Sequence, residues 1–413
     1  MKVLLIHKFH YMVGGTETFH YNLANALIRA GHEVIFFSMY DRRNIPCAQD
    51  KYFVSNVDYN DPDLRGLKKI RAGLKLIYSF ESKEKIARLI RDEKPDIAHI
   101  GLLHRQITFS VVDVLKKNNI PVVMHLHELT CVCPCYTMLR PDGTICSDCA
   151  SGGYINCVRN KCIKGSRAKS MLAFAEAGFL KSGRYYDKID LYIAECDFYK
   201  QIVEKAAFTA SPVIRMYNFL PADQVYLPCP EHDGYILYYG RYAREKGVLT
   251  LLKAFGKLKC PERLVLVGQG AEEQALREYV AENRLEDRVD IRGPIFGREM
   301  ERIIDKAEVV TVPSEWYENG AFAALQAMAK GKIVIASNIA GLSEIIKDGE
   351  TGFLTEPGSP DHLAAAITKV LEMPKERYRK MSGDIVDYVR ERCDENRYMK
   401  ELLAHYAELI AGK

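Results

Sequence analysis

Short apolar runs alternate with longer amphipathic stretches along most of the chain. The runs predict buried strands, and the stretches between them predict helices, for example at 19–30, 109–117 and 167–181. The predicted strands are 3–6, 33–37, 97–100, 121–125, 191–194, 235–239, 264–267, 289–291, 309–312, 333–336 and 353–354. Strands that alternate with helices form parallel sheets covered on both faces, so each half predicts an α/β, doubly wound fold.

Two Rossmann-like domains suit the length of the chain. A chain of 413 residues is too long for one ordinary core. The stretch 211–233 holds four prolines and little periodicity, which indicates a connection between domains. We expect a first domain over 1–215 with a loop-rich insert at 128–165, a second domain over 216–385, and a closing segment over 386–413 with an amphipathic helix near 391–410.

Charge and composition exclude several classes of protein. A net charge of +4 is too small for bulk nucleic-acid binding, and no nucleic-acid-binding signature is present in the sequence. The first residues lack the long apolar core and cleavage site of a signal peptide, and no stretch approaches the roughly 18–20 apolar residues that span a bilayer. We therefore expect a cytoplasmic protein, at most peripheral to a membrane. In that compartment the twelve cysteines are not expected to form disulfides.

Residues 311–344 carry the strongest chemical signal. A strand leads through a polar loop into a small-residue helix that is expected to start near Gly320 and Ala321. This aims the helix N-terminus at the carboxyl edge of a parallel sheet, where α/β proteins bind phosphate groups. Glu318 stands at the mouth of the helix. Gln326 follows eight residues later, roughly 12 Å away on the same helix face, a distance that suits the two ends of a nucleoside diphosphate sugar.

The segment 313–337, PSEWYENGAFAALQAMAKGKIVIAS, resembles the signature of retaining glycosyltransferases with the GT-B fold, in glycosyltransferase family 4. The resemblance implies two Rossmann-like domains that face each other across a cleft, with the C-terminal helix returning to the first domain. It places the donor sugar near Glu318, the diphosphate at the helix tip and the ribose near Gln326. The family has a second Glu where this chain has Gln326, which can hydrogen-bond hydroxyls but carries no charge.

Other motifs of the second half extend the donor site. The loop 240–247, GRYAREKG, is similar to the GRLxxEKG loop of the family and supplies Arg241 and Lys246. Two fixed cations can stabilise a departing diphosphate without a metal ion, so no catalytic cofactor is expected. The resemblance also assigns donor contacts to Gly240, Gly268, Gly270, Ile295 and Glu344. The GxG at 268–270 is weak evidence by itself, and Glu344 equally suits a helix N-terminus.

The first half supplies the expected acceptor side. Gly14, Gly15, Thr16 and Glu17 resemble the family's GGxE loop, with Gly15 against the donor phosphates; the alternative is a glycine turn with Thr16 as a helix cap. His127 follows a strand where family members carry a histidine near the donor sugar, and His125 shares its side of the strand. The resemblance places His104, together with His99, beside the acceptor. Asp61–Pro62–Asp63 lies in a turn-rich stretch and does not indicate a metal-dependent GT-A enzyme.

A cysteine-rich insert is the third feature. Seven of the twelve cysteines lie between residues 131 and 162. Cys146 and Cys149 have the spacing of two thiolates that hold one ion, and with Cys133 and Cys162 they predict a structural Cys₄ zinc site. Some relatives in the family carry a similar insert, with cysteines at these four positions. Unliganded buried thiols and an iron–sulfur cluster remain alternatives.

The combined expectation is a metal-independent, retaining glycosyltransferase. It would move a sugar from a nucleotide-diphosphate sugar to a glycan or lipid-linked acceptor in surface polysaccharide or lipopolysaccharide synthesis. Basic residues among apolar ones from Arg65 to Ile77 suit either an anionic bilayer surface or a solvated helix packed on the sheet. A catalytically silent nucleotide-sugar-binding subunit and a GT-B-fold nucleotide-sugar epimerase are the alternatives. The silent subunit stays an alternative because Gln326 replaces the second Glu of the family pattern.

Overall fold

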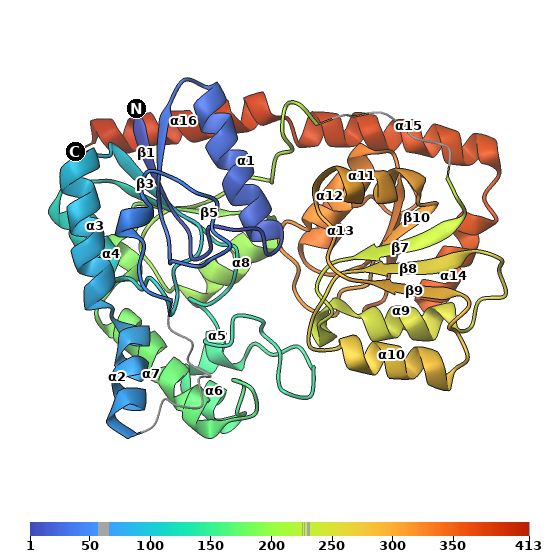
Figure 1. The fold of residues 1–413 in the computed structure, drawn as a ribbon, viewed down its shortest axis with the longest axis horizontal. Helices are drawn as coiled ribbons and strands as arrows, with labels where there is room; N and C mark the ends of the chain where they lie inside the picture. The colour runs from blue at the N-terminus through green and yellow to red at the C-terminus, as the bar shows by residue number, and fades with distance from the viewer. Residues whose placement is uncertain (57–65, 225, 227, 229–231, 413) are drawn as a thin grey trace. The chain divides into compact units, whose positions relative to one another are not determined.

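A computed structural model of the chain describes residues 1–412 apart from 57–65, 225, 227 and 229–231. The chain forms two compact units, the first Met1–Met216 with Asn396–Lys413 and the second Tyr217–Glu395. Each unit is built on one parallel sheet of six strands, as Figure 1 shows. The boundaries predicted from the sequence lie after residues 215 and 385. The turn predicted at Asp61–Asp63 and the basic Arg65 lie outside the described residues.

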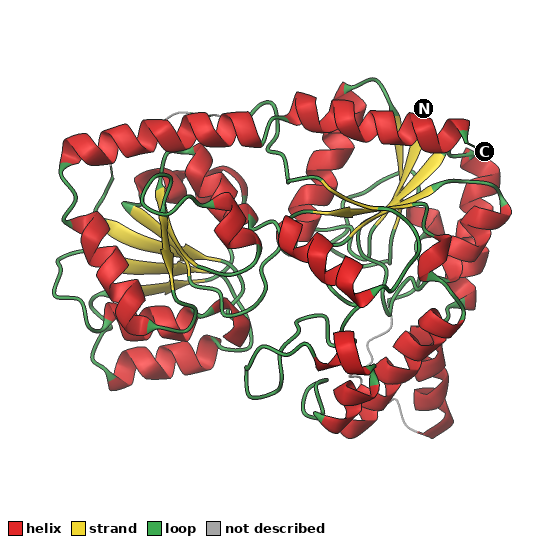
Figure 2. Ribbon diagram, turned by 180° about the vertical axis from the view of Figure 1, so that it is seen from behind, coloured by secondary structure: helices red, strands yellow, loops and turns green. Residues whose placement is uncertain are grey.

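The sheet of unit 1 has the order β2-β1-β3-β4-β5-β6. Its four inner strands are almost entirely buried because both faces are covered by helices, which Figure 2 shows for both sheets. The strands are β1 (Lys2–Ile6), β2 (Glu33–Phe37), β3 (Ile97–Ile100), β4 (Val122–His125), β5 (Leu191–Ala194) and β6 (Val213–Arg215). The helices of this unit are α1 (Gly15–Arg29), α2 (Gly66–Ile77), α3 (Phe80–Glu93), α4 (Ser110–Lys117), α5 (Asp148–Gly152), α6 (Ile155–Arg159), α7 (Arg167–Ser182), α8 (Asp197–Ala206) and α16 (Glu395–Ala411).

Unit 2 repeats this architecture with the strand order β12-β11-β10-β7-β8-β9. Its strands are β7 (Tyr235–Tyr239), β8 (Arg263–Val267), β9 (Val289–Arg292), β10 (Val309–Val312), β11 (Ile333–Ser337) and β12 (Phe353–Thr355). Its helices are α9 (Val248–Phe255), α10 (Glu273–Glu282), α11 (Gly297–Lys306), α12 (Phe322–Ala329), α13 (Gly341–Ile345), α14 (Pro360–Leu371) and α15 (Lys375–Arg392). In each sheet the strand order reverses beside the first strand, and loops at the carboxyl edge there are the usual ligand sites of α/β folds.

Three predicted elements differ from the structure. The helix expected to start near Gly320 begins at Phe322. The helix expected near 391–410 is interrupted, because α15 ends at Arg392 and α16 begins at Glu395. The proline-containing stretch 211–233 also holds the edge strand β6. Pro212 stands just before β6, where a residue without an N–H is tolerated at the start of a strand.

Helix α16 is tied to the sheet of unit 1 through two histidines. Nε2 of His99 on β3 lies 2.6 Å from Nδ1 of His125 on β4, and Nδ1 of His99 contacts the Tyr406 hydroxyl of α16. Nε2 of His125 lies 3.1 Å from the Tyr398 hydroxyl. Both imidazoles are fully enclosed. His99, which the resemblance placed beside the acceptor, therefore lies in the core at the α16 contact.

The buried histidines should make unit 1 sensitive to acid. Burial lowers the pKa of His99 to about 3 and that of His7 to about 3, whereas the unfolded chain has an ordinary value near 6.5. Between these values the unfolded chain binds protons that the folded chain excludes. The free energy of unfolding is thus unaffected above pH ~6.5 and falls below it, by up to about 1.4 kcal/mol per pH unit for each histidine.

Urea unfolding at about pH 7.5 and about pH 5.5 checks this expectation. His99→Gln should flatten the pH dependence, since it removes one of the titrating groups. Replacing His362, whose side chain is exposed in unit 2, should leave it unchanged. Equal stabilities of the wild type at the two pH values would contradict the assignment.

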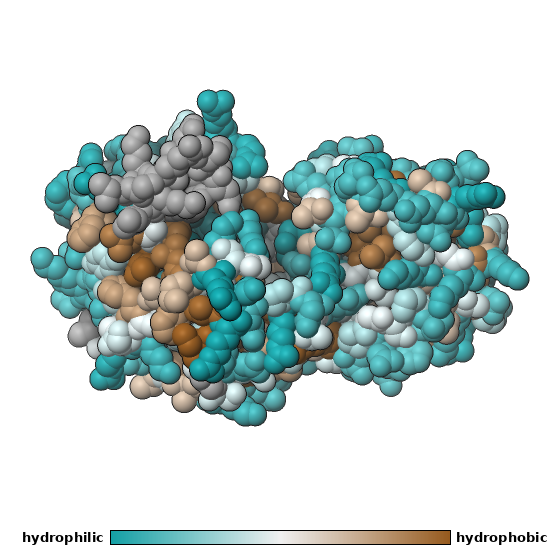
Figure 3. Space-filling view, turned by 90° about the horizontal axis from the view of Figure 1, so that it is seen from below, coloured by the Kyte–Doolittle hydropathy of each residue, from teal (hydrophilic) through white to brown (hydrophobic). Residues whose placement is uncertain are grey.

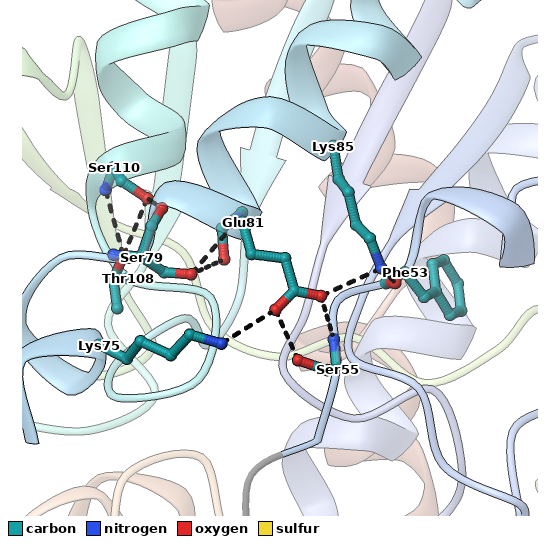
Figure 4. A network of polar contacts seen from close by, with 9 residues as sticks. Phe53, Ser55, Lys75, Ser79, Glu81, Lys85, Thr108 and Ser110 are labelled. Atoms are coloured by element: carbon teal, nitrogen blue, oxygen red, sulfur yellow. Dashed lines mark hydrogen bonds and ion pairs between the residues drawn. The ribbon is translucent and has the colours of Figure 1, made fainter. Parts of the chain in front are cut away.

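A polar network fixes the turn from α2 to α3. Glu81 accepts hydrogen bonds from the Ser55 amide at 2.8 Å and the Ser55 hydroxyl, and its carboxylate pairs with Lys75 at 3.4 Å and Lys85 at 3.1 Å, as Figure 4 shows. Burial would raise the pKa of Glu81, but the hydrogen bonds from Ser55 and the charge of Lys85 outweigh it and lower that pKa to about 2.

No helix in the described part of the chain is long and apolar enough to cross a bilayer.

Candidate active site

Four loops of unit 2 meet at the carboxyl edge of its sheet. They follow β7, β8, β10 and β11, which run parallel, so their loops emerge on the same side. Backbone hydrogen bonds join them: Glu315 N–H to Glu245 O at 2.8 Å, Tyr242 N–H to Gln269 O at 2.9 Å, and Gly341 N–H to Glu318 O at 2.9 Å. The segments expected to bind the donor are therefore one connected set of loops.

Glycines allow these loops to approach so closely. A Cβ on Gly247 would stand 1.9 Å from the Pro313 carbonyl oxygen, and one on Gly268 would stand 1.9 Å from that of Gly240. A Cβ on Gly341 would be equally close to the Asn319 oxygen, and one on Gly270 would be 2.2 Å from the Tyr242 oxygen. The glycines of the GxG motif thus serve the packing of one loop on the next.

We expect Gly247→Ala to loosen the donor loops. Gly247 has a φ of +67° and no room for a methyl group, so the loop that carries Lys246 must move away from Pro313. Nucleotide binding should weaken by about tenfold or more, equivalent to about 1.4 kcal/mol. Trp316, the single tryptophan of the sequence, lies at this loop and can report the titration by fluorescence. Gly383→Ala in α15, where the added methyl meets nothing within 4 Å, is the matched control, and equal affinities in the two variants would contradict this role.

Lys246 and Glu318 form a partly buried ion pair at the centre of the loops, in which the Glu318 carboxylate is the buried partner. The Ser314 hydroxyl donates to Oε1 of Glu318 at 2.6 Å, and Nζ of Lys246 lies 5.0 Å from the centre of the Trp316 ring. Burial would raise the pKa of Glu318, but the charge of Lys246 and hydrogen bonds from Lys246, Ser314 and Trp316 outweigh it, so the pKa is lowered. The carboxylate is therefore held ionised inside the protein. The sequence did not single out Ser314 and Trp316 as partners of this pair.

Arg241 is placed less deeply than Lys246. Its guanidinium pairs with Glu245 at 3.0 Å, and nearly half of its side chain is exposed. The Tyr238 hydroxyl donates to the Arg241 carbonyl at 2.8 Å, which fixes the start of the loop after Gly240. Both cations expected to face the diphosphate thus belong to the loop set, and each is paired with a carboxylate of unit 2.

The premise behind the spacing inferred for Glu318 and Gln326 was wrong. It assumed that both residues lie on one helix, but α12 begins at Phe322, so Glu318 lies in the loop and Gln326 in the second turn. Ala321 precedes the helix with a φ of 16°, and the Gly320 carbonyl accepts a hydrogen bond from Asn218 at 3.2 Å. A helical rise per residue therefore does not describe the separation of the two side chains.

Two further donor-side residues have defined places. Glu344 lies in the first turn of α13, and the Tyr217 hydroxyl donates to its Oε2 at 3.3 Å. Ile295 stands half-buried in the loop between β9 and α11. These positions agree with either reading of Glu344, as a contact on the donor side or as a helix N-terminal carboxylate.

The glycine loop of unit 1 is closed by Glu17. Gly14 caps α1, and its amide donates to Oε2 of Glu17 at 2.9 Å, while the Thr16 hydroxyl donates to Oε1 at 2.9 Å. Thr16 is therefore not the helix cap that the alternative reading required, since it lies inside the first turn. Burial raises the pKa of Glu17 against these hydrogen bonds. Nε2 of His7 stands 3.8 Å from the same carboxylate.

His127 and His104 lie at the carboxyl edge of the unit 1 sheet. Nδ1 of His127 contacts Oε1 of Glu195, with both side chains nearly inaccessible. Nδ1 of His104 is 3.6 Å from Oε1 of Glu128, and burial lowers the pKa of His104 to about 4. Sequence reasoning missed Glu195, although a carboxylate directly after a buried strand is a recognisable signal.

The thiols predicted to bind zinc are only partly brought together. The thiols of Cys133 and Cys149 lie close enough to interact, and the proximity of Cys149 lowers the pKa of the Cys133 thiol. The thiols of Cys157 and Cys162 also lie close to each other, whereas Cys146 lies beside Arg140 and Asp148. Among the residues that the structure describes, no group of three or more His, Cys, Asp or Glu side chains is arranged to hold an ion.

Comparison with known proteins decides the family. A sequence profile for Glycosyltransferase Family 4 matches residues 13–224, half of the chain, and one for glycosyl transferases group 1 matches residues 223–384. The chain belongs to glycosyltransferase family 4. The motifs at 14–17 and 240–247 and the segment 313–337 fall within the matched ranges, so the chain carries family motifs in both units.

Characterised relatives align with parts of the glycosyltransferase. A lipopolysaccharide 1,2-N-acetylglucosaminetransferase of Salmonella typhimurium is 32% identical over 198 residues, which is 44% of this chain and 52% of that protein. A D-inositol 3-phosphate glycosyltransferase of Paenarthrobacter aurescens is 34% identical over 140 residues, or 32% and 34% of the two chains. The chain spans about a third to a half of the length of these two relatives and of two others that it matches.

Solved structures match the whole fold. The sucrose-phosphate synthase of Thermosynechococcus elongatus superimposes with a TM-score of 0.70 at 20% identity, over 100% of both chains. The Anabaena protein HepE in complex with UDP-glucose gives a TM-score of 0.68 at 18% identity, again over 100% of both chains. Together with the two six-stranded parallel sheets, these likenesses show the predicted GT-B fold.

Proposed function

We propose that this glycosyltransferase is a retaining enzyme that moves a sugar from a nucleotide-diphosphate sugar to a glycan or lipid-linked acceptor. The donor would bind unit 2 and the acceptor unit 1. The observation that carries the proposal is the partly buried Lys246–Glu318 pair at the loops of unit 2. A UDP-glucose complex of HepE, which shares the fold, supports a nucleotide sugar as donor. The Salmonella relative acts in lipopolysaccharide synthesis by its name, which supports a surface-glycan pathway.

The proposed chemistry uses fixed charges. The diphosphate gains negative charge as the sugar bond breaks, and Lys246 with Arg241 would stabilise it, since preorganised cations in a water-poor site lower such a barrier. The departing diphosphate would accept the proton of the acceptor hydroxyl, which attacks on the same face. Glu318 would hold the sugar and Gln326 the ribose. Catalysis would need no metal ion.

The experiment is a donor screen with two readouts. UDP, GDP and ADP and their sugars are titrated against Trp316 fluorescence, and release of nucleoside diphosphate is measured with oligosaccharide or lipid-linked acceptors. Proton NMR of the product should show the anomeric configuration of the donor, and EDTA should leave the rate unchanged once any unfolding from loss of zinc in the insert has been excluded. An inverted product or a strict magnesium requirement would contradict the proposal.

A catalytically silent nucleotide-sugar-binding subunit is the second candidate. It is favoured by Gln326, which replaces the charged residue of the family pattern. Such a subunit would bind nucleotide sugar and release no nucleoside diphosphate with any acceptor. A GT-B-fold epimerase would instead interconvert nucleotide sugars without an acceptor, so the product analysis of the same screen separates all three functions.

Zinc in the insert is a further proposal. The contact between Cys133 and Cys149 supports it, because two thiols in contact can bind one ion after loss of their protons. A four-thiol site with Cys146 and Cys162 would require Cys146 to leave Arg140 and Asp148. We expect elemental analysis of protein purified without added metal to find zinc, and Cys133→Ser to lose it. Cys47→Ser, outside the insert, is the control, and zinc-free active protein would contradict the proposal.

Association with an anionic membrane surface is proposed for one face of unit 1. The α2–α7 face, defined by Leu74, Phe80, Met171 and Phe179, exposes large apolar side chains; Figure 3 shows apolar residues gathered on this side of the unit. Phe80 and Phe179 both pack against Tyr78, at 5.3 and 6.1 Å between ring centres, and Arg71 and Lys75 of α2 are exposed beside Leu74. Aromatic and cationic groups together suit a bilayer interface.

Vesicle flotation tests this surface. The wild type should float with phosphatidylcholine vesicles that contain phosphatidylglycerol and not with phosphatidylcholine alone. Phe80→Ser with Leu74→Ser should abolish flotation. Phe296→Ser, which replaces an exposed apolar residue of unit 2, is the control. Equal flotation of both variants would show that the α2–α7 face is not the membrane contact.

A further inference from the structure

Glu195 occupies a position that the sheet register ties to His127. Strands β4 and β5 are parallel neighbours, with His125 paired to Ile193. Continuing that register by two residues sets His127 opposite Glu195, just beyond the ends of the two strands. The side chains meet there: Nδ1 of His127 contacts Oε1 of Glu195, and the two side chains are 2% and 5% exposed.

The imidazole of His127 is held on several sides. The ring of His125 stacks on it, with centres 5.2 Å apart and planes at 14°, and Phe19 meets it edge-on at 5.3 Å. A Cβ on Gly101 would lie 3.6 Å from Cδ2 of His127, an ordinary van der Waals distance, so the Gly101 backbone also lies near the ring. These neighbours restrict the orientation of the ring.

A carboxylate beside one ring nitrogen decides where the imidazole proton lies. An N–H at Nδ1 is attracted to the carboxylate, whereas a lone pair there is repelled, so the neutral ring takes the Nδ1–H tautomer. Nε2 then carries the lone pair and can accept a hydrogen bond from a hydroxyl group. Where a carboxylate orients a metal-ligating histidine in this way, its mutation commonly costs about 10–100-fold in affinity or activity, and we take the same order of magnitude here.

We propose that Glu195 is a positioning residue that holds the proton of His127 on Nδ1, so that Nε2 accepts a hydrogen bond from a sugar hydroxyl. The inference rests on the proposed function for the identity of the ligand, because His127 is the residue expected beside the donor sugar. Glu195 itself touches neither substrate. Its effect reaches the reaction through the tautomer and orientation of one imidazole.

The tautomer can be observed without turnover. In protein labelled with ¹⁵N-histidine, the His127 signals are assigned by their loss in His127→Gln. At about neutral pH the wild type should show a proton on Nδ1 and a bare Nε2. Glu195→Gln should produce a mixture of tautomers, because an amide can either accept or donate at Nδ1. Glu176→Gln, which removes another buried carboxylate of unit 1 that pairs with Arg105, should leave the His127 signals unchanged.

Two results would overturn the inference. One is an Nε2-bound proton in the wild type, from the other tautomer or from a charged ring. The other is a His127 spectrum in Glu195→Gln identical to that of the wild type. If Glu195→Gln fails to fold, Glu195→Asp can be used instead, because it keeps a carboxylate on a shorter side chain. In Glu195→Asp the proton of His127 should stay on Nδ1. A His127 without a proton on Nδ1 in that variant would contradict the proposal.

Kinetic measurements distinguish a role of Glu195 in positioning His127 from a general loss of structure in the variant. Glu195→Gln should lower kcat by about 10–100-fold, with partial recovery in Glu195→Asp. Binding of the plain nucleoside diphosphate, followed by Trp316 fluorescence, should stay within about twofold, since that ligand is assigned to unit 2. If the wild type transfers no sugar from any donor, the proposed function fails, while the NMR measurement still decides the role of Glu195.

Discussion

Replacing Lys246 with Ala should reduce sugar transfer by about 100- to 1,000-fold, which corresponds to ~2.7–4 kcal/mol of transition-state stabilisation. The amine is the cation that lies deepest in the donor loops, where it pairs with Glu318. A departing diphosphate gains charge during the reaction, so the loss should fall on kcat. Single-turnover rates with saturating donor measure it directly.

The same change should also destabilise unit 2. It leaves the Glu318 carboxylate buried without its cation, and breaking a buried pair on one side costs up to about 3–5 kcal/mol. Lys246→Ala with Glu318→Gln should therefore be more stable than Lys246→Ala alone, yet no more active. This double variant distinguishes lost catalysis from lost folding.

One arginine variant and one lysine variant serve as comparisons for Lys246→Ala. Arg241→Ala should slow transfer as well, but its half-exposed pair with Glu245 should change stability by less than about 1 kcal/mol. Lys257→Ala removes an exposed cation that pairs with Asp361 elsewhere in unit 2 and should leave the rate unchanged. Rates within about threefold of the wild type for both Lys246→Ala and Arg241→Ala would remove the two residues from the mechanism.

Much of the fold was predictable because its signals are local. Parallel strands buried on both faces read as short apolar runs, and those at 33–37, 97–100 and 309–312 agree with β2, β3 and β10 to the residue. The ends of helices and strands were harder to predict from the sequence. The start of α12 at Phe322 depends on the conformation of Ala321 and on a hydrogen bond from Asn218 to Gly320, and neither has a signature in the sequence.

The candidate site likewise has residues that the sequence could identify and contacts that it could not. Motif residues such as Lys246 and Glu318 could be selected from the sequence, and the structure adds that they form a pair. The role of Gly247 could not be foreseen, because its closest neighbour is the carbonyl of Pro313, far away in the chain. Contacts of this kind depend on which strands lie side by side. Glu195 and His127 are likewise joined by strand register rather than by sequence distance.

Glu318→Ala should abolish measurable transfer, a loss of at least about 1,000-fold, while binding of a plain nucleoside diphosphate persists. Glu318 lies in the loop before α12, where its carbonyl accepts from Gly341 and its carboxylate from Ser314. We assign this carboxylate to the sugar end of the donor. Its removal should therefore act on the sugar and on Lys246 rather than on the base or ribose. Isothermal titration with nucleoside diphosphate and rate measurements with the full donor separate the two effects.

Gln326 provides the matched comparison, because it lies in the second turn of α12 and is assigned to the ribose end. Gln326→Ala should weaken nucleoside diphosphate binding by about tenfold, the cost of about one hydrogen bond pair, with a smaller effect on kcat. Gln326→Glu restores the residue of the family pattern and should be tolerated, since a carboxylate accepts hydrogen bonds from ribose hydroxyls. If Glu318→Ala and Gln326→Ala weaken plain nucleoside diphosphate binding equally, the assignment of the two side chains to opposite ends of the donor is wrong.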